Sequence, residues 1–173
     1  MIMKKKAFFL ATALLTASVI FYACKKNNEG TTNLRVNLTD APFDASMVNV
    51  DIKEVNVKFR DDSTSWIKLS TKAGVYNLLG LQNGVDTLLA VGPVPTGLLK
   101  EIRLVLGTEN SIVINDTIYP LTIPSGGTSG LKIKVNKNLA AGIDSILVDF
   151  DAGLSVIKTG NGTYILKPVI KLK

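Results

Sequence analysis

The sequence predicts an all-β fold, and more narrowly a single antiparallel β-sandwich of about nine strands. Three observations lead to this fold class. Apolar and polar residues alternate with a period of two through most of the chain, and turn-forming residues interrupt the alternation at intervals of roughly 8–12 residues. In addition, no segment shows a convincing helical period.

The first strands show the clearest alternation. In residues 33–38 every second residue is apolar, which predicts a half-buried strand, and residues 39–44 end it with turn formers. Through residues 48–59 the apolar positions change from even to odd numbers. A strand keeps both sets on one face only if an extra residue is inserted, so we expect a β-bulge near Lys53 and Glu54.

Turn signals divide the remainder of the chain. Residues 75–81 fit either one helical turn or a buried strand. The Asn-Gly pair at 83–84 and the Asn-Asp pair at 115–116 predict tight hairpins, and residues 93–97 predict a turn. Pro168 lacks a backbone donor, so the last strand should lie at a sheet edge or carry a bulge. The other strands are expected at residues 65–69, 85–91, 100–106, 111–114, 117–121, 131–136, 146–150 and 164–172.

The first two dozen residues have the features of an export signal. Three lysines at positions 4–6 precede an uncharged, largely apolar run over residues 7–23, which ends directly before Cys24. We expect cleavage there and acylation of Cys24 with palmitate-type chains, although Phe21 stands where lipoprotein signals usually carry Leu. An uncleaved membrane anchor and ordinary secretion are the alternatives. The expected divisions are a lipoprotein signal peptide (1–23), a flexible spacer (24–32) and a β-sandwich domain (33–173).

The residues after the cysteine bear on the location. Lys25 and Lys26 stand where acidic residues often direct such lipoproteins to the cell surface. We therefore expect a cell-envelope protein, lipid-anchored in the outer membrane, on the periplasmic face rather than on the cell surface.

Composition narrows the chemistry. The chain has no histidine and a single cysteine, which removes the commonest general base, thiolate zinc sites and any intramolecular disulfide. The formal charge is +6, and three of the 20 basic residues leave with the signal while all 14 acidic residues remain. The basic residues are spread along the sequence, so we expect no nucleic-acid partner. The glycine-rich residues 125–130 lead into a strand and not into a helix, unlike a phosphate-binding loop.

Several segments of the chain are distinctive when taken together and in order. They are Leu-Thr-Asp-Ala-Pro at 38–42, Val-Tyr-Asn-Leu-Leu at 75–79, Leu-Gln-Asn-Gly at 81–84, Ile-Arg-Leu-Val-Leu at 102–106, Pro-Ser-Gly at 124–126, Ser-Gly-Leu-Lys-Ile at 129–133, Asp-Phe-Asp at 149–151 and Leu-Lys-Pro-Val-Ile at 166–170. These segments resemble an exported domain catalogued as domain of unknown function 4382, found in Bacteroidetes-type lipoproteins. The resemblance covers nearly the whole mature chain and implies one exported β-rich domain without an established activity. The turn at residues 95–97 is also similar to those of prealbumin-like and carboxypeptidase-regulatory-like sandwiches, which favours an immunoglobulin/prealbumin-like fold.

Four aspartates form one candidate cluster. Asp149 and Asp151 alternate on one face of a strand, and Asp40 and Asp44 lie in an early loop. If the fold brought them together, their oxygen atoms would suit Ca²⁺. The alternative, which we favour, is that Asp149 and Asp151 end a strand and cap a turn. We accordingly expect no metal and no cofactor.

Two further sets of residues are candidates for binding or modification. Trp66 and Tyr76 could form an aromatic platform for a sugar, although a lone tryptophan in a sandwich is more often part of the core. Thr87, Thr117 and Ser145 each follow an aspartate and precede an apolar residue, which resembles the acceptor pattern of Bacteroides-type protein O-glycosylation. Strand starts with exposed hydroxyls explain the same pattern.

These observations lead to one functional hypothesis and two alternatives. We expect a lipid-anchored envelope module that is not an enzyme and that binds a glycan or an envelope protein, or serves a structural role, with the membrane as a partner through the N-terminal lipid. The first alternative is a fimbrillin-like subunit that assembles by strand exchange. The second is a glycan-active enzyme that uses a pair of carboxylates.

Overall fold

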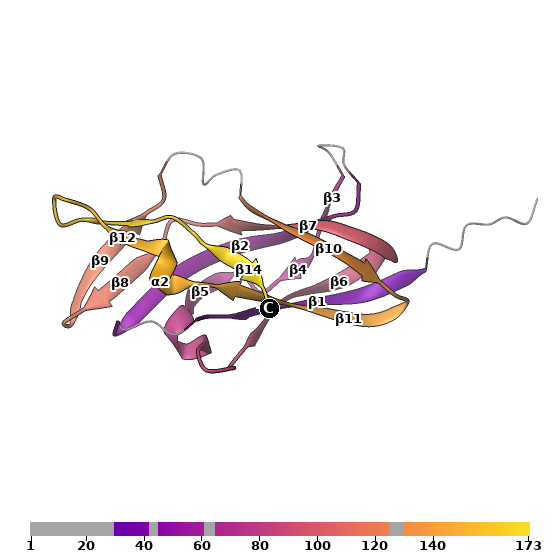
Figure 1. The fold of residues 1–173 in the computed structure, drawn as a ribbon, viewed down its shortest axis with the longest axis horizontal. Helices are drawn as coiled ribbons and strands as arrows, with labels where there is room; N and C mark the ends of the chain where they lie inside the picture. The colour runs from indigo at the N-terminus through magenta and orange to yellow at the C-terminus, as the bar shows by residue number, and fades with distance from the viewer. Residues whose placement is uncertain (1–29, 42–44, 61–64, 125–129) are drawn as a thin grey trace, which may run out of the picture.

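The computed structural model describes residues 30–41, 45–60, 65–124 and 130–173, which form two sheets packed against each other (Figure 1). The predicted all-β fold is confirmed. The five-stranded sheet has the order β14-β11-β1-β6-β4, and the nine-stranded sheet has the order β10-β7-β2-β8-β9-β13-β12, with β3 and β5 also paired to β2. The elements are β1 (Thr31–Thr39), β2 (Met47–Lys58), β3 (Trp66–Lys68), β4 (Ser70–Thr71), β5 (Gly74–Asn77), the 3-10 helix η1 (Leu78–Leu81), β6 (Thr87–Pro95), β7 (Gly97–Leu106), β8 (Ser111–Ile114), β9 (Thr117–Thr122), β10 (Leu131–Leu139), β11 (Gly142–Phe150), the short helix α2 (Ala152–Ser155), β12 (Val156–Lys158), β13 (Tyr164–Leu166) and β14 (Ile170–Leu172).

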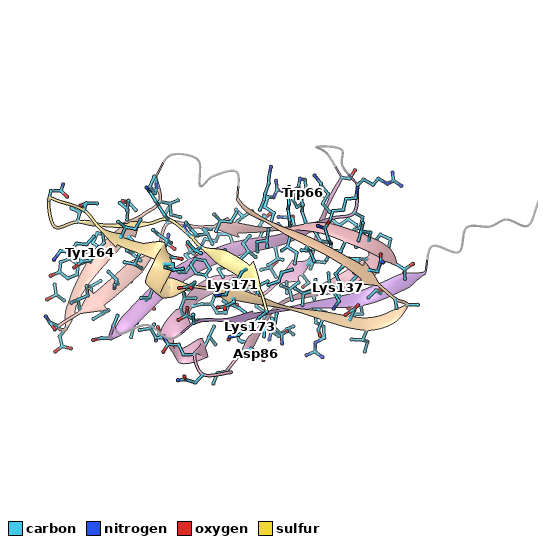
Figure 2. The ribbon with its side chains drawn as sticks, viewed as in Figure 1. Trp66, Asp86, Lys137, Tyr164, Lys171 and Lys173 are labelled. Atoms are coloured by element: carbon cyan, nitrogen blue, oxygen red, sulfur yellow. The ribbon has the colours of Figure 1, made fainter. Side chains whose placement is uncertain are left out.

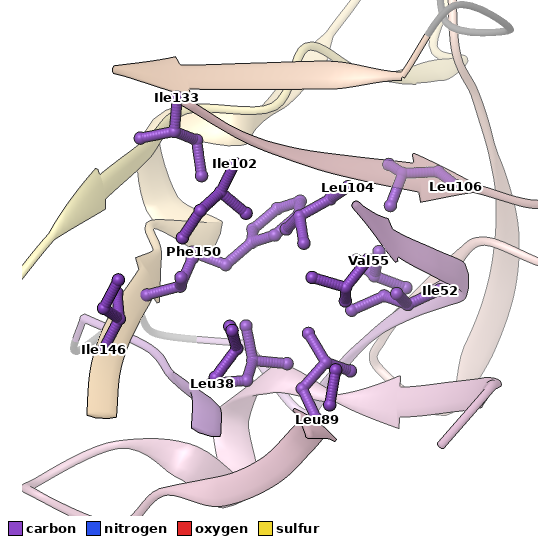
Figure 3. Packing of buried hydrophobic residues seen from close by; sticks show 14 of the residues in the cluster. Leu38, Ile52, Val55, Leu89, Ile102, Leu104, Leu106, Ile133, Ile146 and Phe150 are labelled. Carbon is purple, nitrogen blue, oxygen red and sulfur yellow. The ribbon is translucent and has the colours of Figure 1, made fainter. Parts of the chain in front are cut away.

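The core lies between the two sheets and follows from the alternation in the sequence. Figure 3 shows Leu38 and Leu89 of the five-stranded sheet facing Ile102 and Leu104 of the nine-stranded sheet, with the ring of Phe150 between them. All five side chains are fully buried. Burying a side chain of this size contributes roughly 1.5–3 kcal/mol, so the apolar period of two is what holds the sheets together.

The long strand β2 confirms the predicted bulge. Its pairing with β7 shifts register between Ile52 and Glu54. Because of the inserted residue, Val50 on one side of the bulge and Val55 on the other both face the core. The same shift directs Asn56 and Lys58 to the outer face of the nine-stranded sheet, where the site described below lies.

The strand pairing differs from the prediction in one respect. Most neighbours are antiparallel, but β1 pairs with β11 and β13 pairs with β9 in parallel. Parallel neighbours need a long connection, and most of the domain lies between β1 and β11 in sequence. The described residues contain fourteen strands where about nine were expected. Two expected strands break where the chain crosses from one sheet to the other, giving β3 with β4 and β13 with β14, and β5 and β12 are additional strands.

The turn predictions have mixed outcomes. The hairpin at residues 115–116 is confirmed, since β8 and β9 pair on either side of it and both residues have positive φ. Asn83 and Gly84 also form a tight turn with positive φ. The turn joins the 3-10 helix η1 to β6, and β6 pairs with β1 and β4, so the hairpin prediction there is wrong. Residues 75–81, left open by the sequence, divide into the end of β5 and η1.

Two proline-containing segments also differ from expectation. Residues 93–95 belong to β6, paired with β1, and the turn is confined to Thr96 before β7 begins. The expected last strand is broken at Pro168: β13 pairs with β12 and β9, whereas β14 pairs with β11 in the other sheet. Pro168 therefore lies where the chain crosses between sheets, consistent with its missing donor.

The N-terminal predictions fall largely outside the described residues. The signal segment, Cys24 and most of the spacer lie there, as do Asp44 and most of the glycine-rich loop. β1 begins at Thr31, so the last two residues assigned to the spacer belong to the sheet. Within the described part of the chain, no helix is both long and apolar enough to cross a membrane.

Candidate functional site

The strongest candidate for a site is a group of cationic side chains around Trp66 on the outside of the nine-stranded sheet. It consists of Trp66, Lys58, Lys68, Arg103, Lys132 and Lys134, and we call it the basic face. These residues come from four neighbouring strands, in the order β3, β2, β7 and β10. Figure 2 shows Trp66 beside β3, near β7 and β10.

Strand register explains why these residues meet. Arg103 of β7 lies opposite Asn56 of β2 on one side and opposite Lys132 of β10 on the other. Two residues further along β2, Lys58 lies opposite Trp66 of β3 on one side and opposite Glu101 of β7 on the other. Directly opposed residues on neighbouring strands share a face, so the two rows present their side chains together on the outer surface.

Trp66 forms the centre of the basic face. The Cζ atom of Arg103 lies 4.5 Å from the centroid of its ring, and Nζ of Lys58 lies 5.3 Å from it. Both distances are in the range of cation–π attraction. Trp66 thus reaches from β3 across β2 to a guanidinium on β7, and its ring stays half-buried. The suggestion that the lone tryptophan belongs to the core is wrong, because Trp66 is not part of the buried cluster.

Some of the cations on this face are neutralised and others are not. Lys58 lies 3.3 Å from Glu101, and Lys68 lies 2.5 Å from Glu54. The Lys68 partnership lowers the pKa of Glu54, aided by Asn56. Five cationic side chains therefore face two carboxylates among the described residues of this region.

The remaining cations have donors available. Within the described part of the chain, neither Lys132 nor Lys134 forms an ion pair, although Lys134 stands opposite Glu101 in the strand register, and both side chains are exposed. The buried Nε atom of Arg103 has no hydrogen-bond acceptor there either. The two exposed ammonium groups can donate to an anionic or strongly accepting group, whereas the Nε of Arg103 is covered by the protein.

A shallow pocket adjoins Trp66. Its lining is mostly apolar, with one cation and one hydroxyl, and it opens between the end of β2, β3 and the end of β6. Flat apolar surface next to donors is what a sugar ring with its hydroxyls requires. The lining residues are Phe59, Arg60, Ser65, Trp66, Ile67 and Pro95.

The structure does not bring Tyr76 to this site. Tyr76 lies opposite Val50 on β2, whereas Trp66 lies opposite Lys58, eight residues further along the strand. At about 3.3 Å per residue the two aromatic residues are separated by about 25 Å. Tyr76 packs against the core, donates its hydroxyl to the carbonyl of Lys72, and has its pKa raised by burial. The two residues cannot form one platform.

Three of the four aspartates do lie in one region of the fold. Asp40 Oδ1 accepts a hydrogen bond from the Ala152 amide at 2.9 Å, and Asp151 Oδ1 accepts one from the Leu154 amide at 3.0 Å. Asp151 is thus the N-cap of α2, which confirms the turn-capping interpretation for that residue. Burial raises the pKa of Asp40, and the charge of Asp149 adds to that effect.

Asp149 has a different environment from its neighbours. Its Oδ2 lies 3.5 Å from Nζ of Lys171 on β14 and 3.9 Å from Nζ of Lys173, the residue after that strand. Figure 2 labels the two lysines. Lys171 also lies 3.7 Å from Asp151. Among the described residues, no group of three or more histidine, cysteine, aspartate or glutamate side chains could hold a metal ion. The arrangement is a set of ion pairs between β11 and β14.

The three hydroxyls with an acceptor-like sequence differ in exposure. Thr117 is exposed directly after the turn between β8 and β9, and Ser145 is exposed on β11. Thr87 is half-buried at the start of β6. No two of them lie on neighbouring strands, so they make no common site.

Comparison with known proteins gives a family but no activity. A family model described as Domain of unknown function (DUF4382) matches residues 31–168. The chain belongs to this family. No curated protein and no solved structure matches the chain, so the immunoglobulin/prealbumin likeness stays a prediction. The matched region of the DUF4382 domain includes the whole basic face, whereas β14 lies beyond it.

Sequence reasoning identified Trp66 but missed the cations around it. Arg103, Lys58 and Lys132 are far apart in the DUF4382 sequence, and only the pairing of β2 with β7 and of β7 with β10 brings them together. The one available signal was the alternation of Lys132 and Lys134 with apolar residues, which placed both on one exposed face. Nothing in a single sequence fixes the register against β7.

Proposed function

We propose that this DUF4382 protein is a lipid-anchored module of the cell envelope that binds a glycan, without catalysing a reaction on it, through the basic face. The observation that carries the proposal is the half-exposed ring of Trp66, held against Arg103 and Lys58 on the outside of a sheet. An aromatic ring held in place in this way packs against the apolar face of a pyranose at little cost in conformational entropy.

A non-catalytic role has support from the chemistry of the chain. The sequence has no histidine, and its only cysteine is the expected acylation site. The buried aspartates have structural partners: Asp40 accepts from Ala152, Asp51 accepts from the Glu109 amide, Asp151 caps α2, and Asp149 lies beside two lysines. A carboxylate-based enzyme would need two acids directed into a cleft.

The anchoring part of the proposal rests on the N-terminal sequence. The positive n-region, the apolar run and Cys24 favour a lipoprotein of the Bacteroidetes type, held in the outer membrane on its periplasmic face. Two or three acyl chains hold a protein firmly, whereas one binds marginally. The carbonyl of Gly30 accepts a hydrogen bond from the Thr96 amide at 2.8 Å. Five residues lie between it and Cys24, so the domain begins within about 20 Å of the lipid.

Metabolic labelling tests the anchor. An alkyne analogue of palmitate should label the wild-type protein in its native host, and the Cys24→Ala variant should carry no label. Equal labelling of the two proteins would overturn the lipoprotein assignment. Protease treatment of intact cells then reports the membrane face: a protected chain supports the periplasmic location, and cleavage places the domain on the surface.

Binding to a polysaccharide panel tests the module. Wild-type protein should bind at least one polysaccharide, and Trp66→Ala should lose that binding because the stacking surface is gone. Tyr76→Phe is the matched control, because Tyr76 lies on β5, opposite the other end of β2, and the change leaves its ring against the core. Thermal denaturation confirms that the Trp66→Ala protein is folded. A folded Trp66→Ala protein with unchanged binding would contradict the proposal.

The fimbrillin-like alternative has less support from the strand edges. The longest edge strand is β10, and it carries exposed Lys132 and Lys134. Asn136 has φ of 52°, and the register against β7 shifts between Lys134 and Lys137. Edge lysines and bulges are devices that oppose the addition of another strand. Ladders of assembled subunits on unboiled gels would favour the alternative in spite of this edge.

A further inference from the structure

We infer that the glycan recognised at the basic face is acidic, a polysaccharide with carboxylate groups along its chain. This inference rests on the proposed function and adds the chemical class of the ligand. A neutral sugar needs the ring of Trp66 and a few hydroxyl partners. The basic face offers, in addition, an excess of positive charge placed around that ring.

The charge excess is local, and the sequence does not show it. Seventeen basic and 14 acidic residues remain after removal of the signal, a difference of three. In the described part of the chain, the basic face alone has a net positive charge of the same size, because five cationic side chains stand beside two glutamates. The cations are Lys58, Lys68, Arg103, Lys132 and Lys134. Charge of one sign gathered on one surface raises the local concentration of an oppositely charged ligand.

The distribution of partners within the face indicates where the anionic groups would bind. Glu54 pairs with Lys68 at the β3 side of the face, and Glu101 on β7 pairs with Lys58 while standing opposite Lys134. Arg103, Lys132 and Lys134 form no ion pair within 4 Å among the described residues, although the charge of Arg103 helps to lower the pKa of Glu54, and the three cations lie together on β7 and β10. A sugar on Trp66 would therefore direct its neighbouring units along the row from Arg103 to Lys132.

The spacing of this row suits a polymer. Neighbouring strands are about 4.8 Å apart, and residues two apart on a strand are separated by about 6.7 Å. Arg103 and Lys132 are direct neighbours across strands, and Lys134 is two residues further along β10. Anionic groups repeated along a chain can contact several of these cations at once, which adds avidity to weak single contacts.

Two other anionic polymers or surfaces fit less well. Single-stranded nucleic acid is bound by stacking successive bases on several aromatic residues, whereas this face has Trp66 alone among its described residues. The export signal also places the chain away from cytoplasmic nucleic acid. An anionic lipid surface would be met by a flat face, and it would not need the pocket beside Trp66 that Phe59 and Pro95 line.

The test uses the full chain in a nonionic detergent, with Trp66 as the reporter. Because Trp66 is the only tryptophan, its fluorescence reports directly on the proposed site. Polygalacturonate should change the fluorescence saturably, neutral dextran should have a much weaker effect, and the apparent affinity for polygalacturonate should fall as NaCl rises from about 50 to about 300 mM.

Charge variants complete the test. Lys132→Gln with Lys134→Gln should weaken polygalacturonate binding roughly tenfold. The matched control, Lys72→Gln with Lys167→Gln, removes two exposed lysines outside the basic face and should leave binding unchanged. Equal responses to dextran and polygalacturonate, or an unaffected Lys132/Lys134 variant, would overturn the acidic class and leave glycan binding in place.

The remaining outcomes separate the two proposals. A response only to an oligothymidylate, or only to micelles that contain phosphatidylglycerol, would overturn the inference in favour of that occupant. If no polysaccharide of either kind binds, the proposed function fails together with the inference. A saturable response to polygalacturonate that the Lys132/Lys134 variant weakens supports both.

Discussion

The ammonium of Lys137 on β10 lies 2.7 Å from Asp144 Oδ1 on β11, and this ion pair joins the two sheets. Lys137 also donates to the carbonyl of Ser145 at 2.8 Å. β14 pairs with β11 only at residues 148–150, so the first part of β11 is a sheet edge in the described chain. The contacts of Lys137 therefore close the sandwich along a side that no backbone pairing closes.

Asp144→Asn should lower the free energy of unfolding by about 0.5–1 kcal/mol at neutral pH, the range of partly exposed ion pairs. Lys137 lowers the pKa of Asp144 below its ordinary 3.8. The contribution is therefore present above about pH 4 and is lost as the pH falls through the folded pKa. Urea unfolding at about pH 7 and about pH 2 measures it. Asp116→Asn, in an exposed turn, is the control, and an equal loss in that variant would contradict the assignment.

Asp40 should show the opposite dependence on pH. Burial raises its pKa above 3.8, so the folded state favours the protonated acid, and the benefit is lost as the pH rises through the folded pKa. Asp40→Asn has no charge to bury and keeps an oxygen for the Ala152 amide. Its stability relative to wild type should therefore increase as the pH rises above about 4. A relative stability that falls over the same range would show that the carboxylate is stabilised in the fold.

The sequence was sufficient for the layout of the core and insufficient for the site. The change of parity after Ile52 predicted the bulge of β2, because burial on one face leaves no other arrangement for Val50 and Val55. The Asn83-Gly84 turn was recognised from backbone preferences. Whether the segments on either side of it pair with each other depends on tertiary structure, which these preferences do not determine. The contact between Arg103 and Trp66 could not be predicted either, because the register between distant strands is set by packing across the whole sheet.

Gly107 should not tolerate a side chain. A Cβ atom there would lie 1.9 Å from Asp51 Oδ2, and the amide of Gly107 donates to the Asp51 carbonyl at 2.8 Å. Gly107→Ala should therefore destabilise the fold by roughly 1–3 kcal/mol, measured by urea unfolding. Gly80→Ala is the control, since nothing lies within 4 Å of its Cβ position. If both variants are equally stable, the close approach of Asp51 is not a constraint in solution.

The ion pairs of Asp149 lead to a prediction about the free energy of unfolding. Asp149 is 1% exposed, its Oδ1 has no hydrogen-bond partner among the described residues, and the only cations that approach its Oδ2 there are those of Lys171 and Lys173. Removing both lysines leaves a buried charge without compensation, which costs about 1–3 kcal/mol. Lys171→Met with Lys173→Met should be destabilised by that amount in urea unfolding.

Adding Asp149→Asn to this double variant should restore much of the lost stability, because the amide carries no charge that needs a counterion. Asp149→Asn alone should change stability little, since it removes the burial cost and the ion pairs together. This pattern, in which the third substitution rescues the first two, is specific to compensation of a buried charge. If the lysines act only by packing β14 against β11, Asp149→Asn will add to the loss and the triple variant will be the least stable.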